Sequence, residues 1–347
     1  MSLNMQMQFK RLLLSFTLIG ILSIMSVNIL STTATPLRCF GKPPTITGTA
    51  NFDTLTGTPG NDVIVGLDGD DNIAGLAGDD SICAGPGKDM VAGDSINADR
   101  DDRIISGGND QIDGGSGDDF IWGDGLQAAL HVSNGLTFVG GNDVVMGGDG
   151  NDGISGDAID GSAGSDSIKG GTDNINGGVG NDKIWGDALS ECDFCSLDPL
   201  FMPPAVLAGD SFIGGADIIV GDMGDDELYG DLIQGTKFAD QIQAGDDKIH
   251  GGAGNEVFII GDAIDGDDDF DSIKLGKDQL FGEVGPGNEI LNGDFVTNVE
   301  AISAGDDNLN GGEGPDDQFC GQGIDTVDVG TGVDTASADC ENVTNVP

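Results

Sequence analysis

A single large aliphatic residue recurs at a fixed interval through the first repeated part of the chain. The segments GTPGNDVIV, GLDGDDNIA, GLAGDDSIC and AGPGKDMVA follow one another from Gly57, each with its aliphatic residue at the eighth place. These residues are Ile64, Ile73, Ile82 and Val91. One inward side chain per unit predicts strands of two or three residues separated by turns. Such strands bury too little apolar surface to fold alone, so the pattern predicts a solenoid of stacked coils.

The polar positions of the same units are equally regular. Glycine stands at the first or second and at the fourth place, and the sixth place holds Asp62, Asp71, Asp80 and Asp89 in turn. Glycine allows a positive φ in the turns. A hard cation such as calcium takes about 6 to 8 oxygen ligands, and turns of this kind supply carboxylates and carbonyls. Turn geometry alone and acidic adaptation to high salt are two alternatives. The fixed phase of Asp counts against both, because turns also accept Asn or Ser.

Beyond the regular units, the Asp-x-aliphatic steps follow a longer cycle. From Asp143 the steps are 9, 5, 9 and 7 residues long, a cycle of 30, and the same series starts again at Asp217. The two later cycles, which end near Asp278 and Asp307, have 31 and 29 residues. We expect four strand-and-turn steps per cycle, with the last step often loosened into a loop.

The five-residue step is the shortest in each cycle. In GGVGNDKIWGDAL it joins Asp182 to Asp187. A turn this short leaves no room for a full ligand shell around a cation. We therefore expect alanine at Asp152 or Asp182 to weaken calcium binding more than alanine at Asp157 or Asp187.

From about Gly57 to Ser337 the chain resembles the repeats-in-toxin (RTX) calcium-binding family, whose nonapeptide is GGxGxDxUx with U a large aliphatic residue. The resemblance implies an all-β fold, a parallel β-roll or β-helix solenoid with loop insertions and calcium ions in the turns. It also implies that two steps make one coil, so that acids 18 apart share an edge. Asp62 and Asp80 would then line one edge, and Asp71 and Asp89 the other.

The calcium ligands expected from the pattern and the resemblance are the phase-setting acids and the carbonyl groups of the turns. The acids are Asp62, Asp71, Asp80, Asp89, Asp110, Asp119, Asp143, Asp152, Asp173, Asp182, Asp217, Asp226, Asp247, Asp278, Asp307, Asp325 and Asp334. The carbonyls lie near Gly60, Gly69, Gly78, Gly117, Gly150, Gly180 and Gly224. Multiple Ca²⁺ ions are the expected cofactor.

The charge of the chain fits cation binding and excludes one class of partner. The sequence has 61 acidic residues against 13 basic ones, a net charge of −48, and eight of the acids are Glu. A nucleic-acid partner bound through a basic surface is excluded. Repulsion between so many carboxylates favours an expanded chain until a cation neutralises them. We therefore expect calcium binding to drive folding.

The N-terminus and the cysteines indicate export. Lys10 and Arg11 precede an apolar run at 12–30 and a small-residue stretch ending at Ala34, a pattern typical of a secretory signal. An uncleaved membrane anchor is the alternative, because the run is about 20 residues long, and this segment would then be the one contact with a membrane. The six cysteines follow this segment and predict disulfides. Nearest-neighbour pairing joins Cys39 to Cys83, Cys192 to Cys195 and Cys320 to Cys340.

Other chemistry suggested by short motifs is weaker. The CDFC at 192–195 is alternatively a redox or zinc half-site, and DGDDDFD at 265–271 resembles an incomplete EF-hand loop. Ser95 and Ser211 follow Gly-Asp as in serine esterases, and Asp247 lies three residues before His250. Gly-Asp-x-aliphatic recurs with other residues in the serine place, so that place is a variable position of the repeat. We expect no enzyme activity and no catalytic residues.

The sequence divides into five parts. They are 1–34 (signal or anchor), 35–56 (lead-in), 57–105 (regular repeats), 106–319 (interrupted repeats, with the longest loop at 190–209) and 320–347 (last repeats and cap). We expect an extracellular or cell-surface calcium-binding protein with a structural or adhesive role toward surface or matrix components. One alternative is a hydrolase with a site at 190–204 or near His131. The other is a glycan-binding module that uses Trp122, Trp185 and Tyr229, although packing under adjacent loops also explains these aromatic residues.

Overall fold

The computed structural model describes most of the chain beyond the expected export segment. The described residues are 36–97, 104–127, 137–160, 167–189, 210–235, 239–254, 258–266, 272–283, 289–297, 302–303, 305–313, 315–321, 323–331 and 334–344. The expected signal or anchor, the longest loop, its two cysteines, His131 and most of 265–271 lie outside these ranges. Where the chain is described, it contains no helix that is long and apolar enough to cross a membrane.

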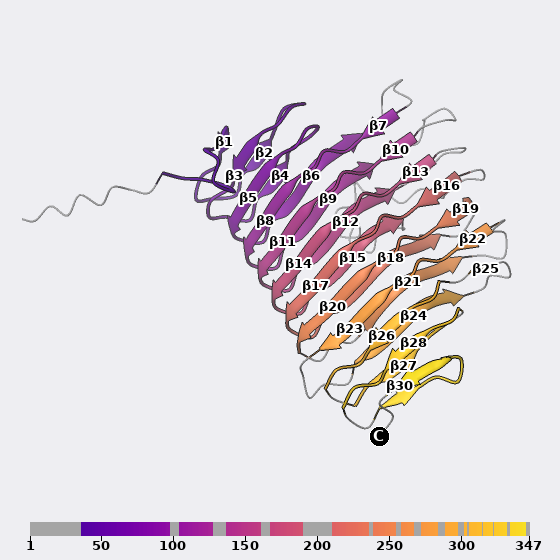
Figure 1. Cartoon of the computed structure of the whole chain (residues 1–347). Helices are drawn as coiled ribbons and strands as arrows, with labels where there is room; N and C mark the ends of the chain where they lie inside the picture. The colour runs from indigo at the N-terminus through magenta and orange to yellow at the C-terminus, as the bar shows by residue number, and fades with distance from the viewer. Residues whose placement is uncertain are drawn as a thin grey trace, which may run out of the picture. The chain divides into compact units, whose positions relative to one another are not determined.

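Within the compact unit Arg38–Pro347, the described strands form three parallel sheets, shown stacked in chain order in Figure 1. The first sheet contains β1 (Ile46–Thr47), β3 (Val63–Val65), β5 (Ser81–Pro86), β8 (Gln111–Ser116), β11 (Val144–Asp149), β14 (Asn174–Val179), β17 (Ile218–Met223), β20 (Lys248–Ala253), β23 (Gln279–Glu283), β26 (Asn308–Asn310), β28 (Thr326–Asp328) and β30 (Asn342–Thr344). The second sheet contains β2 (Thr54–Thr56), β4 (Asn72–Ala74), β6 (Met90–Asn97), β9 (Phe120–Gln127), β12 (Gly153–Asp160), β15 (Lys183–Leu189), β18 (Glu227–Gly235), β21 (Phe258–Gly266), β24 (Ile290–Thr297), β27 (Asp317–Phe319) and β29 (Thr335–Ala336). The third sheet contains β7 (Ile104–Ser106), β10 (Thr137–Val139), β13 (Ser167–Lys169), β16 (Asp210–Ile213), β19 (Ala239–Gln243), β22 (Ser272–Lys274) and β25 (Ile302–Ser303).

The solenoid is narrow at both ends and wider between them. At the N-terminal end Ile46 pairs with Ile64, and near the C-terminal end Asn308 pairs with Thr326, which are offsets of 18 residues. These coils contain one strand of each of the first two sheets. In the middle the offset is about 30, as for Val144 and Asn174, because each coil adds a strand of the third sheet. It is 44 between Asn174 and Ile218, where the chain contains its longest loop. The parallel solenoid predicted from the sequence is confirmed, including the pairing of residues 18 apart.

The prediction of four strand-and-turn steps per cycle was wrong, because each wide coil has three strands. The two steps separated by five residues lie on one strand of the second sheet. In β15, Ile184 and Asp187 belong to the same strand, and Asp187 pairs with Asp157 and Asp231 on its neighbours. Five residues span about 17 Å when extended, so this step continues a strand and makes no turn.

The inward side chains form two apolar stacks. Ile154, Ile184 and Leu228 of the second sheet pack with aliphatic residues of the first sheet in one continuous core, and all three are fully buried. The third sheet has a buried row of its own that includes Phe138 and Phe212. Each inward aliphatic residue contributes about 1.5 to 3 kcal/mol on burial. The aspartate that ends each five-residue step lies in a strand of the second sheet, and it follows the residue of that strand that belongs to the first stack.

Candidate metal centres

The structure arranges buried and half-buried acidic residues, all but one of them aspartates, in three rows along the solenoid. The first row immediately precedes strands of the first sheet and contains Asp62, Asp80, Asp110, Asp143, Asp173, Asp217, Asp247, Asp278, Asp307 and Asp325. The second row precedes strands of the second sheet and contains Asp53, Asp71, Asp89, Asp119, Asp152, Asp182, Asp226, Glu289, Asp316 and Asp334. The third row lies within the long strands of the second sheet and contains Asp94, Asp124, Asp157, Asp187, Asp231, Asp262 and Asp294. Each acid expected as a ligand from the sequence belongs to one of the first two rows.

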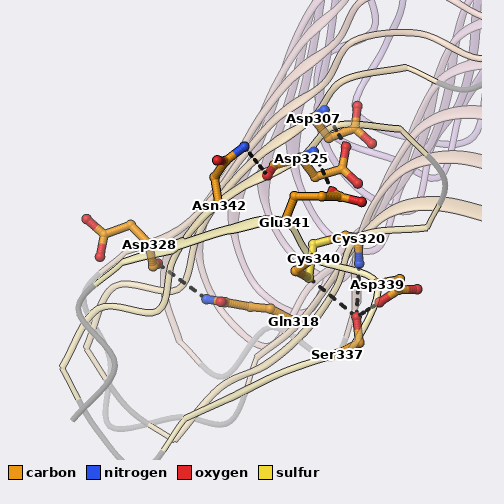
Figure 2. The surroundings of a disulfide bond; sticks show 10 residues. All are labelled: Asp307, Gln318, Cys320, Asp325, Asp328, Ser337, Asp339, Cys340, Glu341 and Asn342. Atoms are coloured by element: carbon orange, nitrogen blue, oxygen red, sulfur yellow. Dashed lines mark hydrogen bonds between the residues drawn. A yellow bond between two sulfur atoms is a disulfide. The ribbon is translucent and has the colours of Figure 1, made fainter.

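In most first-row and second-row acids, one carboxylate oxygen accepts a hydrogen bond from the backbone N–H of the matching acid in the preceding coil. The N–H of Asp110 donates to Oδ1 of Asp143 at 2.8 Å, and the N–H of Asp152 donates to Oδ1 of Asp182 at the same distance. The pattern continues along the first row to Glu341, whose Oε2 accepts from the N–H of Asp325 at 3.0 Å (Figure 2). These hydrogen bonds fix the orientation of each carboxylate.

The third-row aspartates from Asp94 to Asp262 are held from the opposite turn. Asp157 accepts a hydrogen bond on Oδ2 from the N–H of Gly171 at 2.6 Å, and Asp231 accepts one from Gly245 at 2.6 Å. The side chains of Asp157, Asp187 and Asp231 are completely buried. The structure therefore places these acids in the interior, beside the turn that leads from the third sheet back to the first.

The second oxygen of these carboxylates is buried with no hydrogen-bond donor. This holds for Oδ2 of Asp143 and Asp173 in the first row and for Oδ1 of Asp157 and Asp187 in the third. A buried carboxylate oxygen without a partner costs several kcal/mol when the group is charged. A proton or a cation at these oxygens would remove this cost.

The first and third rows meet in clusters of three aspartates. They include Asp80, Asp94 and Asp110; Asp124, Asp143 and Asp157; Asp157, Asp173 and Asp187; Asp187, Asp217 and Asp231; and Asp231, Asp247 and Asp262, with the ligand oxygens of each group within 4.8 Å of one another. Oxygen atoms this close fit around one Ca²⁺, whose oxygen ligands lie at about 2.3 to 2.6 Å. The donor set fits a hard cation.

Glycines keep the space beside these carboxylates open. A Cβ on Gly123 would lie 2.0 Å from Oδ2 of Asp143 and 2.6 Å from the carbonyl oxygen of Gly156. The structure thus brings a first-row carboxylate and a backbone carbonyl toward the same point. In the turns between the first two sheets, a Cβ on Gly180 would lie 1.5 Å from the carbonyl oxygen of Gly150. Six of the seven glycines named from the sequence leave no room for a Cβ, because backbone atoms of the neighbouring coil are too close: Gly69, Gly78, Gly117, Gly150, Gly180 and Gly224. Gly60 has open space beside it.

Burial changes the acidity of the clustered groups. Desolvation, together with neighbouring carboxylates, raises the pKa of Asp110 to about 9 and the pKa of Asp143 to about 10. The same causes, desolvation first, raise the pKa of Asp187 well above its ordinary value. Ionised carboxylates at these positions therefore require a cation beside them.

Asp62, at the start of the first row, has different surroundings. Its Oδ2 accepts hydrogen bonds from the N–H of Thr58 at 2.6 Å and the hydroxyl of Thr58 at 2.8 Å, and its Oδ1 accepts one from the hydroxyl of Thr45 at 2.9 Å. Burial opposes ionisation here, but the hydrogen bonds from Thr58 and Thr45 outweigh it, and the pKa is lowered. Asp62 is thus held as a carboxylate by protein donors.

Sequence reasoning missed the third row. The recurrence of Gly-Asp five residues after many second-row acids was visible, as in Asp182 and Asp187, but it was interpreted as a short turn. The expected disulfides Cys39–Cys83 and Cys320–Cys340 are present. The Cys192–Cys195 pair lies outside the described residues and stays a prediction.

Comparison with known protein families agrees with this geometry. The family model of the RTX calcium-binding nonapeptide repeat (4 copies) matches residues 47–82, 56–91, 98–125, 140–158, 169–188, 214–232 and 229–258. No curated protein matches the chain. RTX calcium-binding nonapeptide repeats therefore extend across much of the chain.

Proposed function

We propose that this calcium-binding RTX repeat protein is an exported, non-enzymatic structural or adhesive protein whose solenoid folds when calcium binds. The observation that carries the proposal is the set of buried carboxylate oxygens without donors, exemplified by Oδ2 of Asp143 and Oδ1 of Asp187. Calcium neutralises these groups and allows the coils to stack, so metal binding becomes folding free energy. The folded solenoid then presents its loops to surface or matrix components.

The disulfides support export to an oxidising compartment. Cys39–Cys83 and Cys320–Cys340 lie toward the two ends of the solenoid. Disulfides persist in extracellular proteins and are rare in reducing compartments. Calcium is also abundant outside cells, so both conditions for the folded state are met there.

The arrangement of the candidate serine-esterase residues supports a non-enzymatic role. Asp247 is buried in the first row, where its N–H donates to Oδ1 of Asp278 at 2.8 Å. His250 stacks on Phe281 with ring centroids 4.5 Å apart. A catalytic triad needs its acid hydrogen-bonded to the histidine, whereas Oδ1 of Asp247 accepts the N–H of Asp217 at 2.8 Å. Hydrolysis of an ester substrate that is lost in Ser211→Ala would contradict this part of the proposal.

A glycan-binding role is a second candidate, favoured by aromatic rings on the second sheet. Trp185 and Tyr229 stack with centroids 6.1 Å apart and planes 12° apart, and both side chains are half-buried. Stacked aromatic rings offer a surface to sugar rings. Binding to a glycan array that disappears in Tyr229→Ala would support this candidate over a purely structural role.

Calcium titration of the purified chain with intact disulfides tests the main proposal. Chelator should remove most of the far-ultraviolet circular dichroism signal of the β structure, and calcium should restore it cooperatively. Magnesium at the same concentration serves as the control and should restore much less. A full β signal in chelator that calcium does not change would overturn the proposal.

A further inference from the structure

The third row shares its carboxylates between neighbouring clusters. Asp157 belongs to the cluster with Asp143 and to the next cluster with Asp173, and Asp187 belongs likewise to two clusters. Asp157 and Asp187 are direct partners on adjacent parallel strands. Adjacent strands lie about 4.8 Å apart. From the cluster that contains Asp124 to the one that contains Asp262, successive clusters are therefore one strand spacing apart and have one carboxylate in common.

The charge added by each wide coil is constant along this part of the solenoid. The coil of β14 and β15 contributes Asp173 from the first row and Asp187 from the third, and the next coil contributes Asp217 and Asp231. Two carboxylates per coil match the charge of one divalent cation per coil. The second row contributes a single carboxylate per coil, such as Asp182.

The orientation of the third-row carboxylates provides independent support for a bound ion. Oδ2 of Asp187 accepts a hydrogen bond from the N–H of Gly215 at 2.5 Å, while Oδ1 is buried without a donor. The side chain is completely buried and pairs on both sides with equally buried third-row acids. Oδ1 is thus fixed toward the cluster and has no other partner there.

We propose that the first and third rows together hold a continuous file of calcium ions, one per wide coil, in which each third-row carboxylate bridges two neighbouring ions. This inference rests on the calcium-dependent folding proposed above. It assigns to the Gly-Asp aspartates, which lie outside the sixth place of the nonapeptide, a role as bridging ligands. It also reverses the expectation from spacing, because Asp187 would contact two ions.

Calcium suits these positions better than magnesium. Mg²⁺ dehydrates reluctantly and usually keeps several water ligands, whereas Ca²⁺ accepts a flexible shell of protein oxygens. The clusters are built from fully buried carboxylates such as Asp157 and Asp187. A Cβ on Gly186 would meet Oδ2 of Asp217 at 2.0 Å and the carbonyl oxygen of Gly230 at 2.7 Å. The ligand space is thus lined by protein oxygens.

Three variants of the full chain with the same charge change test the file. Asp187→Asn removes a bridging carboxylate, Asp182→Asn removes a second-row carboxylate from the same coil, and Asp149→Asn removes an exposed one. Calcium per chain is measured by atomic emission after equilibration in excess magnesium and gel filtration. Asp187→Asn should lose about two ions and raise the calcium midpoint for folding at least threefold. Asp149→Asn should match the wild type, and Asp182→Asn should lose fewer ions than Asp187→Asn.

The outcomes separate the file from the proposed function. If the wild type folds with calcium but Asp187→Asn keeps the wild-type ion count, the file is wrong and calcium-dependent folding stands. A larger loss in Asp182→Asn than in Asp187→Asn also overturns the file. If the wild type itself neither binds calcium nor folds with it, the proposed function fails first.

A direct measurement on the wild type decides the question even if Asp187→Asn fails to fold. Anomalous scattering from crystals grown with calcium should show a line of peaks between the first-row and third-row aspartates, spaced by about 4.8 Å. Peaks confined to the turns of the second row would overturn the proposal.

Discussion

At the residue scale, the two oxygens of a row aspartate have separate partners. Oδ1 of Asp143 accepts the N–H of Asp110, whereas Oδ2 is buried and open toward the cluster. In the folded solenoid this backbone hydrogen bond fixes the rotamer and directs the second oxygen toward the cluster. Aspartate suits this geometry because its short side chain holds the second oxygen close to the turn. The scarcity of glutamate in so acidic a sequence follows from this requirement.

The glycine before a third-row aspartate should tolerate no side chain. In Gly123→Ala the Cβ would lie 2.0 Å from Oδ2 of Asp143 and 2.6 Å from the carbonyl oxygen of Gly156. Because a backbone atom must shift, we expect the free energy of unfolding in calcium to fall by about 2 kcal/mol or more. The calcium midpoint should rise as well. Denaturant unfolding at saturating calcium measures the first effect.

Gly125→Ala is the matched control on the same strand. Its Cβ would have its nearest contact, the carbonyl oxygen of Asp94, at 3.6 Å, an ordinary van der Waals distance. We expect a change within about 0.5 kcal/mol. Equal destabilisation by Gly123→Ala and Gly125→Ala would show that the space beside Asp143 is not the cause.

At the element scale, the sequence predicts the strands of the first sheet well and the long strands of the second sheet poorly. The nine-residue phase locates Ile64 and Ile82, which pair as expected. The five-residue step between Asp182 and Asp187 has the same Asp-x-aliphatic signature, but it lies within β15. Periodicity marks which residues face inward. It does not distinguish a strand that continues from a strand that ends. The continuation depends on the turn after the third sheet, where the N–H of Gly215 donates to Asp187 in the second half of β15.

The first coil should remain folded when calcium is removed. Thr58 and Thr45 supply the hydrogen bonds that Asp62 needs, and Thr49 donates its N–H at 2.6 Å and its hydroxyl at 2.8 Å to Oδ2 of Asp53. The Cys39–Cys83 disulfide closes the same region. Hydrogen exchange in chelator should therefore leave β3 protected while β14 and β15 exchange. Uniform exchange across these strands would contradict the prediction.

Thr58→Val tests whether the threonine hydroxyl provides this protection. The variant removes one of the donors to Oδ2 of Asp62 at nearly constant volume, so β3 should lose about 1 kcal/mol of protection in chelator. Thr56→Val changes an exposed threonine of β2 and should leave β3 unchanged. Unaltered protection in Thr58→Val would show that the disulfide alone maintains the first coil.

The C-terminal end depends on its own disulfide. Cys320, fully buried in the core, bonds to Cys340 across 20 residues, and Glu341 next to it accepts the N–H of Asp325 (Figure 2). Replacing both cysteines by alanine should cost the last coil about 3 kcal/mol. In calcium, β28 and β30 should then exchange faster while β14 is unchanged. The matched Cys39→Ala/Cys83→Ala variant should affect β3 instead, and equal exchange at both ends in both variants would contradict the local role.

At the scale of the whole molecule, the sequence predicts a calcium-binding solenoid but not its wide section. The 30-residue cycle and the excess of Asp are visible in the sequence. The clusters around Asp157 and Asp187 join acids from different coils and different sheets. Their proximity depends on the offset of 30 residues between Asn174 and Val144 and on the return from the third sheet. The spacing of the aspartates along the sequence predicts this offset only when the number of strands per coil is known.

Acid should partly replace calcium in the folding of this chain. Burial and neighbouring carboxylates raise the pKa of Asp94 to about 7 and that of Asp110 to about 9, from an ordinary value of 3.8. Between the ordinary pKa of 3.8 and these raised pKa values, the carboxylates are deprotonated in the unfolded chain but stay protonated in the calcium-free folded chain. The stability of the calcium-free fold therefore falls as pH rises through this window and is retained below about pH 4. In chelator, lowering the pH from about 8 to about 5 should increase the β signal in circular dichroism.

The calcium-loaded protein should respond to pH in the opposite direction, and this contrast is the decisive control. Protons compete with the cation for the same carboxylate oxygens, so the calcium midpoint should rise as pH falls. Asp143→Asn removes a group whose pKa burial raises to about 10, and it should weaken the acid-induced gain of β structure in chelator. Asp149→Asn, which changes an exposed carboxylate, should keep the wild-type gain. If acid lowers the β signal in chelator and calcium alike, carboxylate repulsion inside the solenoid is not what keeps the calcium-free chain unfolded.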